Sequence, residues 1–244
     1  MNWHLSTRPL RAVRLLTFDL DDTLWPCFPV IHAAEREVHA WLDQAAPELA
    51  RRYDIDALRE HRQQLARDNP DQAHDLTGLR LRSYRELARR HGVDEAIAEQ
   101  ANVIFRRARN RVTPFEEVVE VLTRLRRHYR LVAVSNGNAQ VECTPLADCF
   151  DHAFMAEEVG AAKPDPALFH AASQATGIPL EQAAHVGDDP LRDVEAARRA
   201  GMHTVWVNRE GADWPAELPP PDVQVRDLRQ LLDYLLSESG RAAQ

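Results

Sequence analysis

The chain has 244 residues, of which 44% are hydrophobic and 28% charged, an ordinary composition for a globular protein. Its formal net charge of −8 at pH 7 argues against nucleic acid as a main partner, because binding to phosphate backbones needs a basic surface. We find no signal peptide, no membrane-spanning stretch and no Cys-x-x-Cys pair among the three cysteines, so we expect a cytoplasmic protein without a membrane partner.

The first predicted element is a buried strand in the apolar run over residues 13–18. It is followed by Asp19-Leu-Asp21-Asp-Thr23, which places two carboxylates one residue apart at the mouth of the strand. Such carboxylates are costly unless their charge is used or neutralised, and Mg²⁺ prefers oxygen ligands. The pattern therefore favours a metal-assisted nucleophilic site. The alternative is a capping or turn cluster, in which Asp and Thr are common.

A helical segment follows, between the breaks at Pro26 and Pro29 and at Thr113-Pro114. Its length and its helical spacing predict an inserted bundle of about four helices. The apolar positions that define two of them are Ala34, Val38, Trp41 and Leu42, and Ile97, Ala101, Ile104, Phe105 and Ala108. We expect a helical domain over residues 25–113 and a second domain formed by residues 1–24 and 114–244.

After Pro114 helical and strand patterns alternate, which implies parallel strand pairing in a doubly wound α/β sheet. Ligands of such sheets lie beyond the carboxyl ends of the strands. The regions of Asp19, Ser135 and Asp188 each follow a predicted strand and should therefore gather at one edge. The expected helices cover residues 115–127, 167–176, 194–200 and 228–236, and the expected strands cover residues 131–134, 183–186 and 204–207, with a short edge strand at 223–225.

The turn that begins with Ser135, Asn136 and Gly137 offers a hydroxyl and backbone N–H groups that can hold phosphate oxygens. An ordinary turn has the same composition. Lys163 lies in a proline-stiffened loop and offers an ammonium group to an anion, although most lysines are solvated surface residues.

Gly187-Asp188-Asp189 follows a predicted strand and opens a helix that contains Asp193. Asp188 is a candidate metal ligand, and Asp189 or Asp193 would orient the other ligands. The alternative is an N-terminal helix cap. His185 lies in an apolar strand and is predicted to be a core histidine rather than a metal ligand. The sequence contains no P-loop and no Gly-x-Ser-x-Gly elbow.

Together, Asp19-Leu-Asp21-Asp-Thr23, Ser135, Lys163 and Gly187-Asp188-Asp189 resemble, in order, the motifs of the haloacid dehalogenase superfamily of phosphohydrolases. The helical insert resembles the cap domain of one large subgroup. This resemblance implies a Rossmann-like core with a helical cap, and phosphatase activity on a small phosphorylated metabolite. The oligomeric state, monomer or homodimer, stays open.

The resemblance also implies roles for the first carboxylates. Asp19 would attack phosphorus and form an aspartyl-phosphate, and Asp21 would protonate the leaving alkoxide and then deprotonate water. Mg²⁺ would be held by the Asp19 carboxylate, the Asp21 backbone carbonyl and Asp188.

The remaining motif residues would handle the phosphoryl group. Ser135, Asn136 and Gly137 would hold phosphate oxygens, Thr23 would lie on the substrate side, and Lys163 would neutralise charge on both the nucleophile and the phosphate. Asp193 would support Lys163 or the metal from behind.

Five segments carry a narrower resemblance, at residues 18–24, 29–31, 74–77, 136–140 and 185–189. In these segments the chain resembles the bacterial YigB-type phosphatases, which act on flavin mononucleotide (FMN) and on the phosphorylated ribitylaminouracil intermediate of riboflavin synthesis. This resemblance implies that Trp25 would stack on a flavin or uracil ring, or alternatively pack in the core. Asp75 and Arg80 would face the substrate, or lie on an ordinary helix surface.

Three rival functions remain open. A dehalogenase of the same superfamily attacks carbon and needs neither a second carboxylate nor Mg²⁺, so Asp21 argues against it. A phosphomutase returns the phosphoryl group to its substrate and differs in releasing no phosphate. A catalytically silent metabolite-binding or interaction module would show no Mg²⁺-dependent phosphatase activity.

Overall fold

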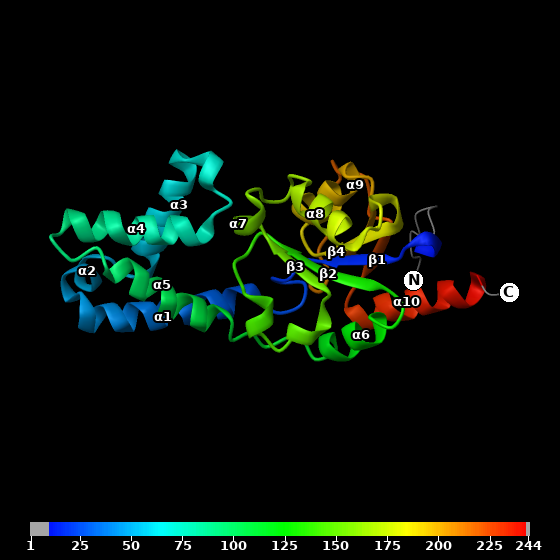
Figure 1. The fold of residues 1–244 in the computed structure, drawn as a ribbon, viewed down its shortest axis with the longest axis horizontal. Helices are drawn as coiled ribbons and strands as arrows, with labels where there is room; N and C mark the ends of the chain where they lie inside the picture. The colour runs from blue at the N-terminus through cyan, green and yellow to red at the C-terminus, as the bar shows by residue number, and fades with distance from the viewer. Residues whose placement is uncertain (1–9, 243–244) are drawn as a thin grey trace. The chain divides into compact units, whose positions relative to one another are not determined.

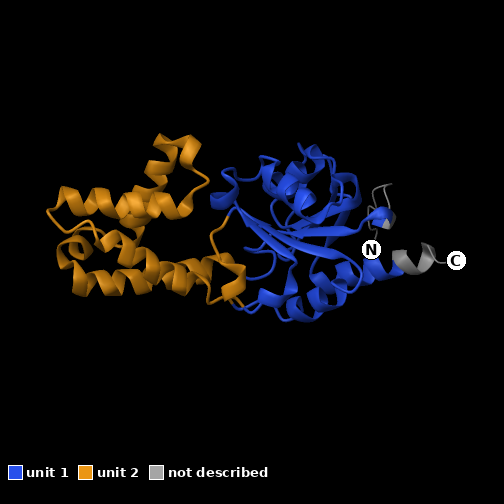
Figure 2. Cartoon of the chain, in the orientation of Figure 1, with its two compact units in different colours: residues 1–26, 113–136, 145–244 blue, residues 27–112, 137–144 orange. Residues whose placement is uncertain are grey.

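The structure is a computed structural model that describes residues 10–242. It divides into two compact units (Figure 2). Unit 1 comprises residues 1–26, 113–136 and 145–244, and unit 2 comprises residues 27–112 and 137–144. No described helix is both long enough and apolar enough to cross a membrane.

Unit 1 is built on a six-stranded sheet in the order β3-β2-β1-β4-β5-β6, with every neighbouring pair parallel (Figure 1). The sheet confirms the predicted doubly wound α/β fold. The strands are β1 (Leu15–Phe18), β2 (Arg130–Ser135), β3 (His152–Met155), β4 (Ala183–Gly187), β5 (His203–Val207) and β6 (Val223–Val225).

Helices cover both faces of this sheet, with α8 and α9 on one face and α6 and α10 on the other (Figure 1). All residues of β1 and β4 are buried, which explains why these strands are nearly continuous apolar runs. The helices are α6 (Val118–Leu125), α7 (Ala156–Val159), α8 (Ala167–Thr176), α9 (Ala196–Arg199) and α10 (Leu228–Ala242). Short 3-10 turns lie in unit 1 at Leu10–Ala12, Ala147–Cys149 and Leu180–Gln182, and in unit 2 at Pro70–Gln72 and Val141–Cys143.

Two local differences from the sequence prediction have physical causes. The expected helix over residues 194–200 is a π-helical turn at Pro190–Glu195 that continues into α9, and Asp189 caps the turn. Strand β3 was not predicted, because it is short and three of its four residues are exposed or half-buried, so it lacks an apolar run.

Unit 2 is helical and has its own apolar core, which includes Val38, Leu42, Leu87 and Phe105. It contains five α-helices among its described residues rather than about four, because Pro47 opens a short additional helix directly after the first. The helices are α1 (Cys27–Ala45), α2 (Pro47–Arg52), α3 (Ile55–Asp68), α4 (Leu76–Arg90) and α5 (Ile97–Arg109).

Residues 137–144 belong to unit 2 although they follow β2 directly. The Asn138 side chain donates to the Thr77 hydroxyl over 3.3 Å. Asn110 and Gln140 exchange two hydrogen bonds, of 3.1 Å between their side chains and 2.9 Å from the Gln140 backbone N–H. The second half of the Ser135 turn is therefore tied to the helical unit.

Candidate active site

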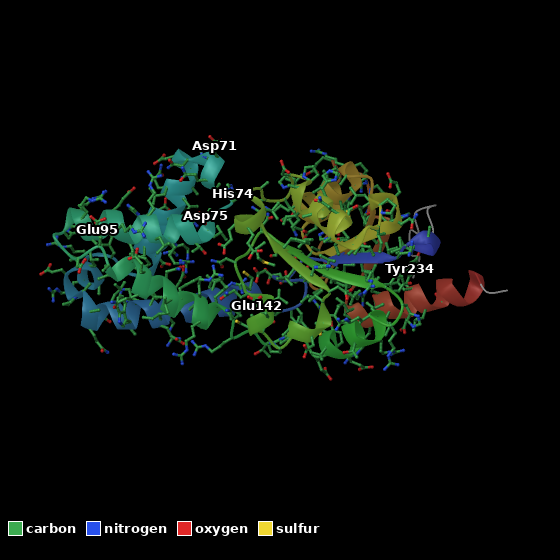
Figure 3. The ribbon with its side chains drawn as sticks, in the orientation of Figure 1. Asp71, His74, Asp75, Glu95, Glu142 and Tyr234 are labelled. Carbon is green, nitrogen blue, oxygen red and sulfur yellow. The ribbon has the colours of Figure 1, made fainter. Side chains whose placement is uncertain are left out.

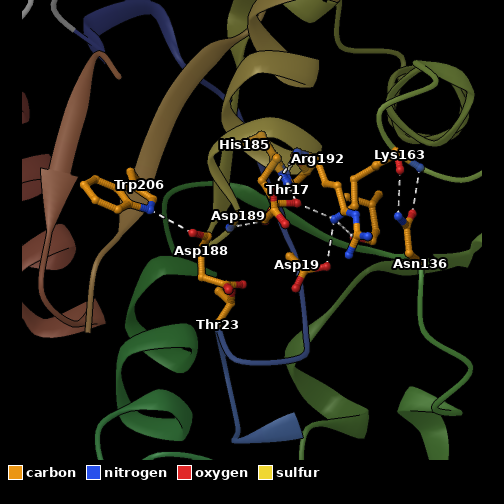
Figure 4. Close-up of polar contacts among 12 residues, drawn as sticks. Thr17, Asp19, Thr23, Asn136, Lys163, His185, Asp188, Asp189, Arg192 and Trp206 are labelled. Carbon is orange, nitrogen blue, oxygen red and sulfur yellow. Dashed lines mark hydrogen bonds and ion pairs between the residues drawn. The ribbon is translucent and has the colours of Figure 1, made fainter. Parts of the chain in front are cut away.

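The predicted site residues of unit 1 gather at the carboxyl edge of the sheet (Figure 4). Asp19 follows β1, Ser135 ends β2 and Asp188 follows β4. Since β2, β1 and β4 are consecutive neighbours in the sheet, their carboxyl ends lie side by side. The parallel topology alone thus brings the three segments together, as the sequence predicted.

Lys163 is the cation at the centre of the site. Its ammonium group donates to Asp19 Oδ1 over 2.7 Å, to Asp193 Oδ1 over 2.6 Å and to the Val134 carbonyl over 3.0 Å. The residue is only 3% exposed. Burial alone lowers the pKa of Lys163, but the two carboxylates outweigh it and raise the pKa above its ordinary value. Lys163 is therefore a permanently charged group in contact with the candidate nucleophile.

Asp193 anchors that lysine. Its Oδ1 lies 3.2 Å from His185 Nε2 as well as contacting Lys163, and its Oδ2 accepts from the Asp189 backbone N–H over 2.9 Å. Burial raises the pKa of Asp193, but Lys163 and His185 more than compensate, so the pKa lies well below its usual range. Both oxygens of Asp193 are engaged, which favours the predicted supporting role over direct metal ligation.

His185 is a buried core histidine, as its apolar surroundings in the sequence indicated. Its Nδ1 lies 2.8 Å from the Thr17 hydroxyl, and its ring packs edge-on against Phe169. Burial lowers its pKa, so the imidazole is neutral at pH 7. Its link to Lys163 through Asp193 was not predicted, because no spacing rule connects residue 185 with a loop at residue 163.

Asn136 positions the same lysine from the other side. Its side-chain oxygen accepts from the Lys163 backbone N–H over 2.7 Å, and its side-chain nitrogen donates to the Lys163 carbonyl over 2.8 Å (Figure 4). Sequence reasoning assigned only the Asn136 backbone to the site, together with Ser135 and Gly137. Ser135 is buried at the end of β2, and Gly137 belongs to unit 2.

The arrangement of carboxylates fits a divalent cation. Oxygen atoms of Asp19, Asp188 and Asp193 all lie within 4.8 Å of one another. Burial, and then the Asp193 charge, raise the pKa of Asp188 to about 7, and burial together with Asp193 and Asp188 raises the pKa of Asp19. A second positive charge beside Lys163 would relieve this repulsion, and Asp19 and Asp188 are the groups placed to hold it.

The loop after β1 is a tight turn that fixes Asp21. Asp22 has a φ of 60°, and its backbone N–H donates to the Trp25 carbonyl over 2.7 Å. Asp residues tolerate this left-handed conformation better than most. The turn brings Trp25 Nε1 to 2.8 Å from Asp21 Oδ1, where it donates a hydrogen bond.

The structure decides two sequence predictions at this loop. Of the two alternatives for Trp25, stacking on a substrate ring is wrong and packing in the core is confirmed, because the side chain is fully buried and offers no ring face to a ligand. Thr23 was predicted to contact substrate, but it is fully buried too, and its hydroxyl donates to Asp188 Oδ1 over 2.9 Å. Both residues position carboxylates instead.

The second aspartate after β4 also has a structural role. Asp189 Oδ1 accepts hydrogen bonds of 2.8 Å from the Leu191 and Arg192 backbone N–H groups, so it caps the following turn. Trp206 Nε1 donates to the Asp188 backbone carbonyl over 2.8 Å. Trp206 lies on a different strand and gave no signal in the sequence.

The two residues named from the sequence at α4, its N-cap Asp75 and Arg80 within it, both make contacts inside unit 2. Asp75 caps α4 by accepting from the Gly78 backbone N–H over 2.7 Å, and its position is labelled in Figure 3. Arg80 is buried rather than on a helix surface, with its guanidinium carbon 3.3 Å from the centroid of the Phe105 ring. Burial lowers the pKa of Arg80 to about 9.

Comparisons with known proteins match this geometry. A model of the haloacid dehalogenase-like hydrolases matches residues 13–201. The Escherichia coli 5-amino-6-(5-phospho-D-ribitylamino)uracil phosphatase YigB is 34% identical over 87% of this chain and 92% of its own length. A phosphoserine phosphatase of Thermus thermophilus is 37% identical over 63% of this chain and 64% of its own.

Among solved structures, a 2-haloacid dehalogenase from Pseudomonas syringae aligns with a TM-score of 0.86 and 36% identity, covering 92% of this chain and 99% of that one. The family model covers most of the chain, and the matched region contains Asp19, Asp21, Ser135, Lys163, Asp188 and Asp193. The chain belongs to the haloacid dehalogenase-like hydrolase family, and the phosphatases among its relatives support a phosphatase activity.

Proposed function

We propose that the protein is a Mg²⁺-dependent phosphomonoesterase that works through a phosphorylated Asp19. The observation that carries the proposal is the contact of 2.7 Å between Lys163 Nζ and Asp19 Oδ1, with the Asp188 carboxylate close by. Burial raises the pKa of Asp19, whereas Lys163 lowers it, and a divalent cation held by Asp19 and Asp188 would lower it further, which favours the ionised, nucleophilic form of this carboxylate.

In the first step, an Asp19 carboxylate oxygen forms a bond to phosphorus while the bond from phosphorus to the leaving alkoxide breaks. Asp21 transfers its proton to that alkoxide, giving an alcohol. In the second step, a water molecule attacks phosphorus, its proton passes to Asp21, and the bond to Asp19 breaks to release inorganic phosphate. The Asp21 carboxyl is then protonated again for the next turnover.

The surroundings keep the two carboxylates in separate roles. Asp19 is 8% exposed and contacts Lys163, whereas Asp21 is half-buried and accepts a hydrogen bond from Trp25. Mg²⁺ held by Asp19 and Asp188 would supply charge neutralisation between nucleophile and phosphate. Different environments for two neighbouring carboxylates are the usual basis for opposite proton roles.

For the substrate, we propose FMN or 5-amino-6-(5-phospho-D-ribitylamino)uracil. The support is the similarity to YigB, whose name states that it acts on the latter compound and which this chain matches over 92% of that protein's length. Phosphoglycolate, nucleotides and sugar phosphates are the alternative substrates. We further propose a cytoplasmic enzyme, since the cysteines described are free thiols.

Dehalogenation is the second candidate function, favoured by the TM-score of 0.86 with a 2-haloacid dehalogenase. The two reactions share a carboxylate nucleophile, but carbon–halogen displacement needs no proton donor for the leaving group. The hydrogen bond that fixes Asp21 and the Thr23 hydroxyl that fixes Asp188 support phosphate chemistry.

The test is a release assay with purified protein. FMN, the ribityl intermediate, the alternative phosphates and a 2-haloacid are each incubated with Mg²⁺ and with a chelator. We expect phosphate release that depends on Mg²⁺ and is greatest for FMN or the ribityl intermediate. Halide release that is insensitive to the chelator, without phosphate release, would overturn the proposal.

A further inference from the structure

A basic cavity of about 550 Å³, open to solvent and lined by exposed arginines, lies in unit 1 away from the candidate active site. Arg14 directly precedes β1 and Arg130 is the first residue of β2, so the cavity lies at the amino ends of these strands. The active-site residues follow the carboxyl ends of the same strands. The two sites therefore lie at opposite edges of one sheet.

Positive charge dominates the lining. Four arginines contribute to it, at positions 14, 126, 127 and 130, and Asp151 is the single carboxylate among the described lining residues. This concentration runs against the chain's net charge of −8. In a chain with more acidic than basic residues, four arginines beside one carboxylate are not expected by chance. The clustering of these arginines therefore needs a physical explanation.

Asp151 neutralises only part of this charge. Its Oδ1 lies 3.5 Å from Arg126 and 3.4 Å from Arg130, both at the long end for an ion-paired hydrogen bond. Its Oδ2 accepts from the Leu131 backbone N–H over 3.0 Å. One carboxylate with one oxygen directed to two guanidinium groups leaves the cavity strongly positive.

Strand pairing keeps two of the arginines close together. The Arg130 backbone N–H donates to the Arg14 carbonyl over 2.9 Å, and Arg130 is in register with Leu15. Arg14 therefore lies one position away from the residue directly opposite Arg130. The C-terminus of α6 accounts for basic residues at 126 and 127 through its dipole, but it gives no reason for Arg14 and Arg130.

We propose that this cavity binds a small oligophosphate, such as pyrophosphate or the diphosphate group of a nucleotide. Guanidinium groups pair with phosphate oxygens in a bidentate manner, and several of them converge here. The cavity volume falls within the usual range for small-molecule sites, which favours a compact polyanion over an extended acidic peptide. The proposal does not depend on the reaction at Asp19.

The test is calorimetric titration of the full-length protein with pyrophosphate in Mg²⁺-free buffer of low ionic strength. We expect one class of sites in the unchanged protein, because without Mg²⁺ the clustered carboxylates of the active site repel a polyanion. The double variant Arg14→Ala/Arg130→Ala should bind pyrophosphate at least about tenfold more weakly. Added salt should weaken this binding.

The matched control is Arg124→Ala, which removes an exposed arginine of α6 that does not line the cavity. It should leave pyrophosphate binding unchanged, and both variants should keep the thermal unfolding midpoint and the activity of the unchanged protein. Absence of pyrophosphate binding by the unchanged protein, or the same affinity in the double variant and the control, would overturn the proposal. Citrate binding more tightly than pyrophosphate or ADP would overturn the assignment to phosphate.

Discussion

Lys163 shows how a single residue organises the candidate site. Burying a lysine to 3% exposure would be costly without compensating charge. Here two carboxylates and a backbone carbonyl accept the three hydrogen bonds that its ammonium group can donate. The same contacts leave the ammonium with no freedom to turn away from Asp19. The lysine is therefore fixed in charge and in position before any substrate binds.

Trp25 acts on the reaction through Asp21, and Trp25→Phe tests that role. The substitution keeps most of the buried ring but removes the hydrogen bond of 2.8 Å to the Asp21 carboxylate. With Asp21 less well oriented, we expect kcat to fall about tenfold, equivalent to about 1.4 kcal/mol, with little change in KM. Steady-state phosphate release at several pH values measures the effect, and the pH profile should change as well.

The matched control for this prediction is Trp214→Phe. It removes an indole hydrogen bond of 2.9 Å to the Leu218 carbonyl, which has no link to Asp21. Its kcat should stay unchanged. Equal kcat values for the two variants would show that Trp25 has only a packing role.

At the scale of elements, the end of β4 can pack closely against the Asp193 side chain of the following turn because residue 187 is a glycine. A Cβ at this position would lie 2.4 Å from Asp193 Cγ, so a larger residue would displace the carboxylate that holds Lys163. We expect Gly187→Ala to lower the free energy of unfolding by about 1–3 kcal/mol and to reduce activity sharply. Denaturant unfolding and phosphate release are the measurements.

A second substitution identifies the cause of that destabilisation. In Asp193→Gly the whole side chain that the new Cβ would meet is absent, including the Asp193 Cβ, which would lie 2.5 Å from it. If the collision is responsible, Gly187→Ala should cost less in the Asp193→Gly background than in the unchanged protein. An equal cost in both backgrounds would contradict this explanation.

Glu117 connects α6 with two other parts of unit 1. Its carboxylate accepts from Arg209 over 2.8 Å, and Arg209 also donates to the Thr23 carbonyl over 2.9 Å. Burial raises the pKa of Glu117, but a backbone hydrogen bond and Arg209 outweigh it, so the pKa lies below 4.5. A lowered pKa in the folded state means that ionisation stabilises the fold above the unfolded-state pKa.

Glu117→Gln should therefore lower the free energy of unfolding at neutral pH by about 1 kcal/mol. The difference from the unchanged protein should begin to close as the pH falls below about 4.5 and should vanish once the folded-state carboxyl is protonated. Denaturant titrations across this pH range measure it. Glu120→Gln on the same helix is the control, since Glu120 is exposed and 3.6 Å from its partner Arg124. A difference that stays constant with pH would contradict the assignment.

At the scale of the whole molecule, much of the core fold could be predicted because its central strands are buried on both faces. β1, β2 and β4 are mostly apolar and almost wholly buried, and the topology then dictates that their following residues meet. Strand β3 could not be predicted, because its half-exposed residues leave no pattern of that kind.

Within the site, too, some contacts could be predicted from the sequence and others could not. Placing Asp19 and Asp188 at the same side of the sheet required only parallel strands that end at these residues, which the alternating helix and strand pattern predicts. The contact between Thr23 and Asp188 joins residues 165 positions apart, and its direction depends on the left-handed turn at Asp22. Hydrogen-bond direction of this kind comes from three-dimensional geometry, which is why Thr23 and Trp25 were assigned to substrate.

The most direct test of the account is to trap the phosphorylated enzyme. Asp21→Asn should slow both proton transfers, so that acid quenching after mixing with Mg²⁺ and a substrate that is turned over leaves one phosphoryl group on the peptide that contains Asp19. Mass spectrometry of the intact protein and of its peptides detects it, with Asp19→Asn as the control that should carry none. Phosphate release by Asp19→Asn at the native rate, or a phosphoryl group on a different peptide, would contradict the account.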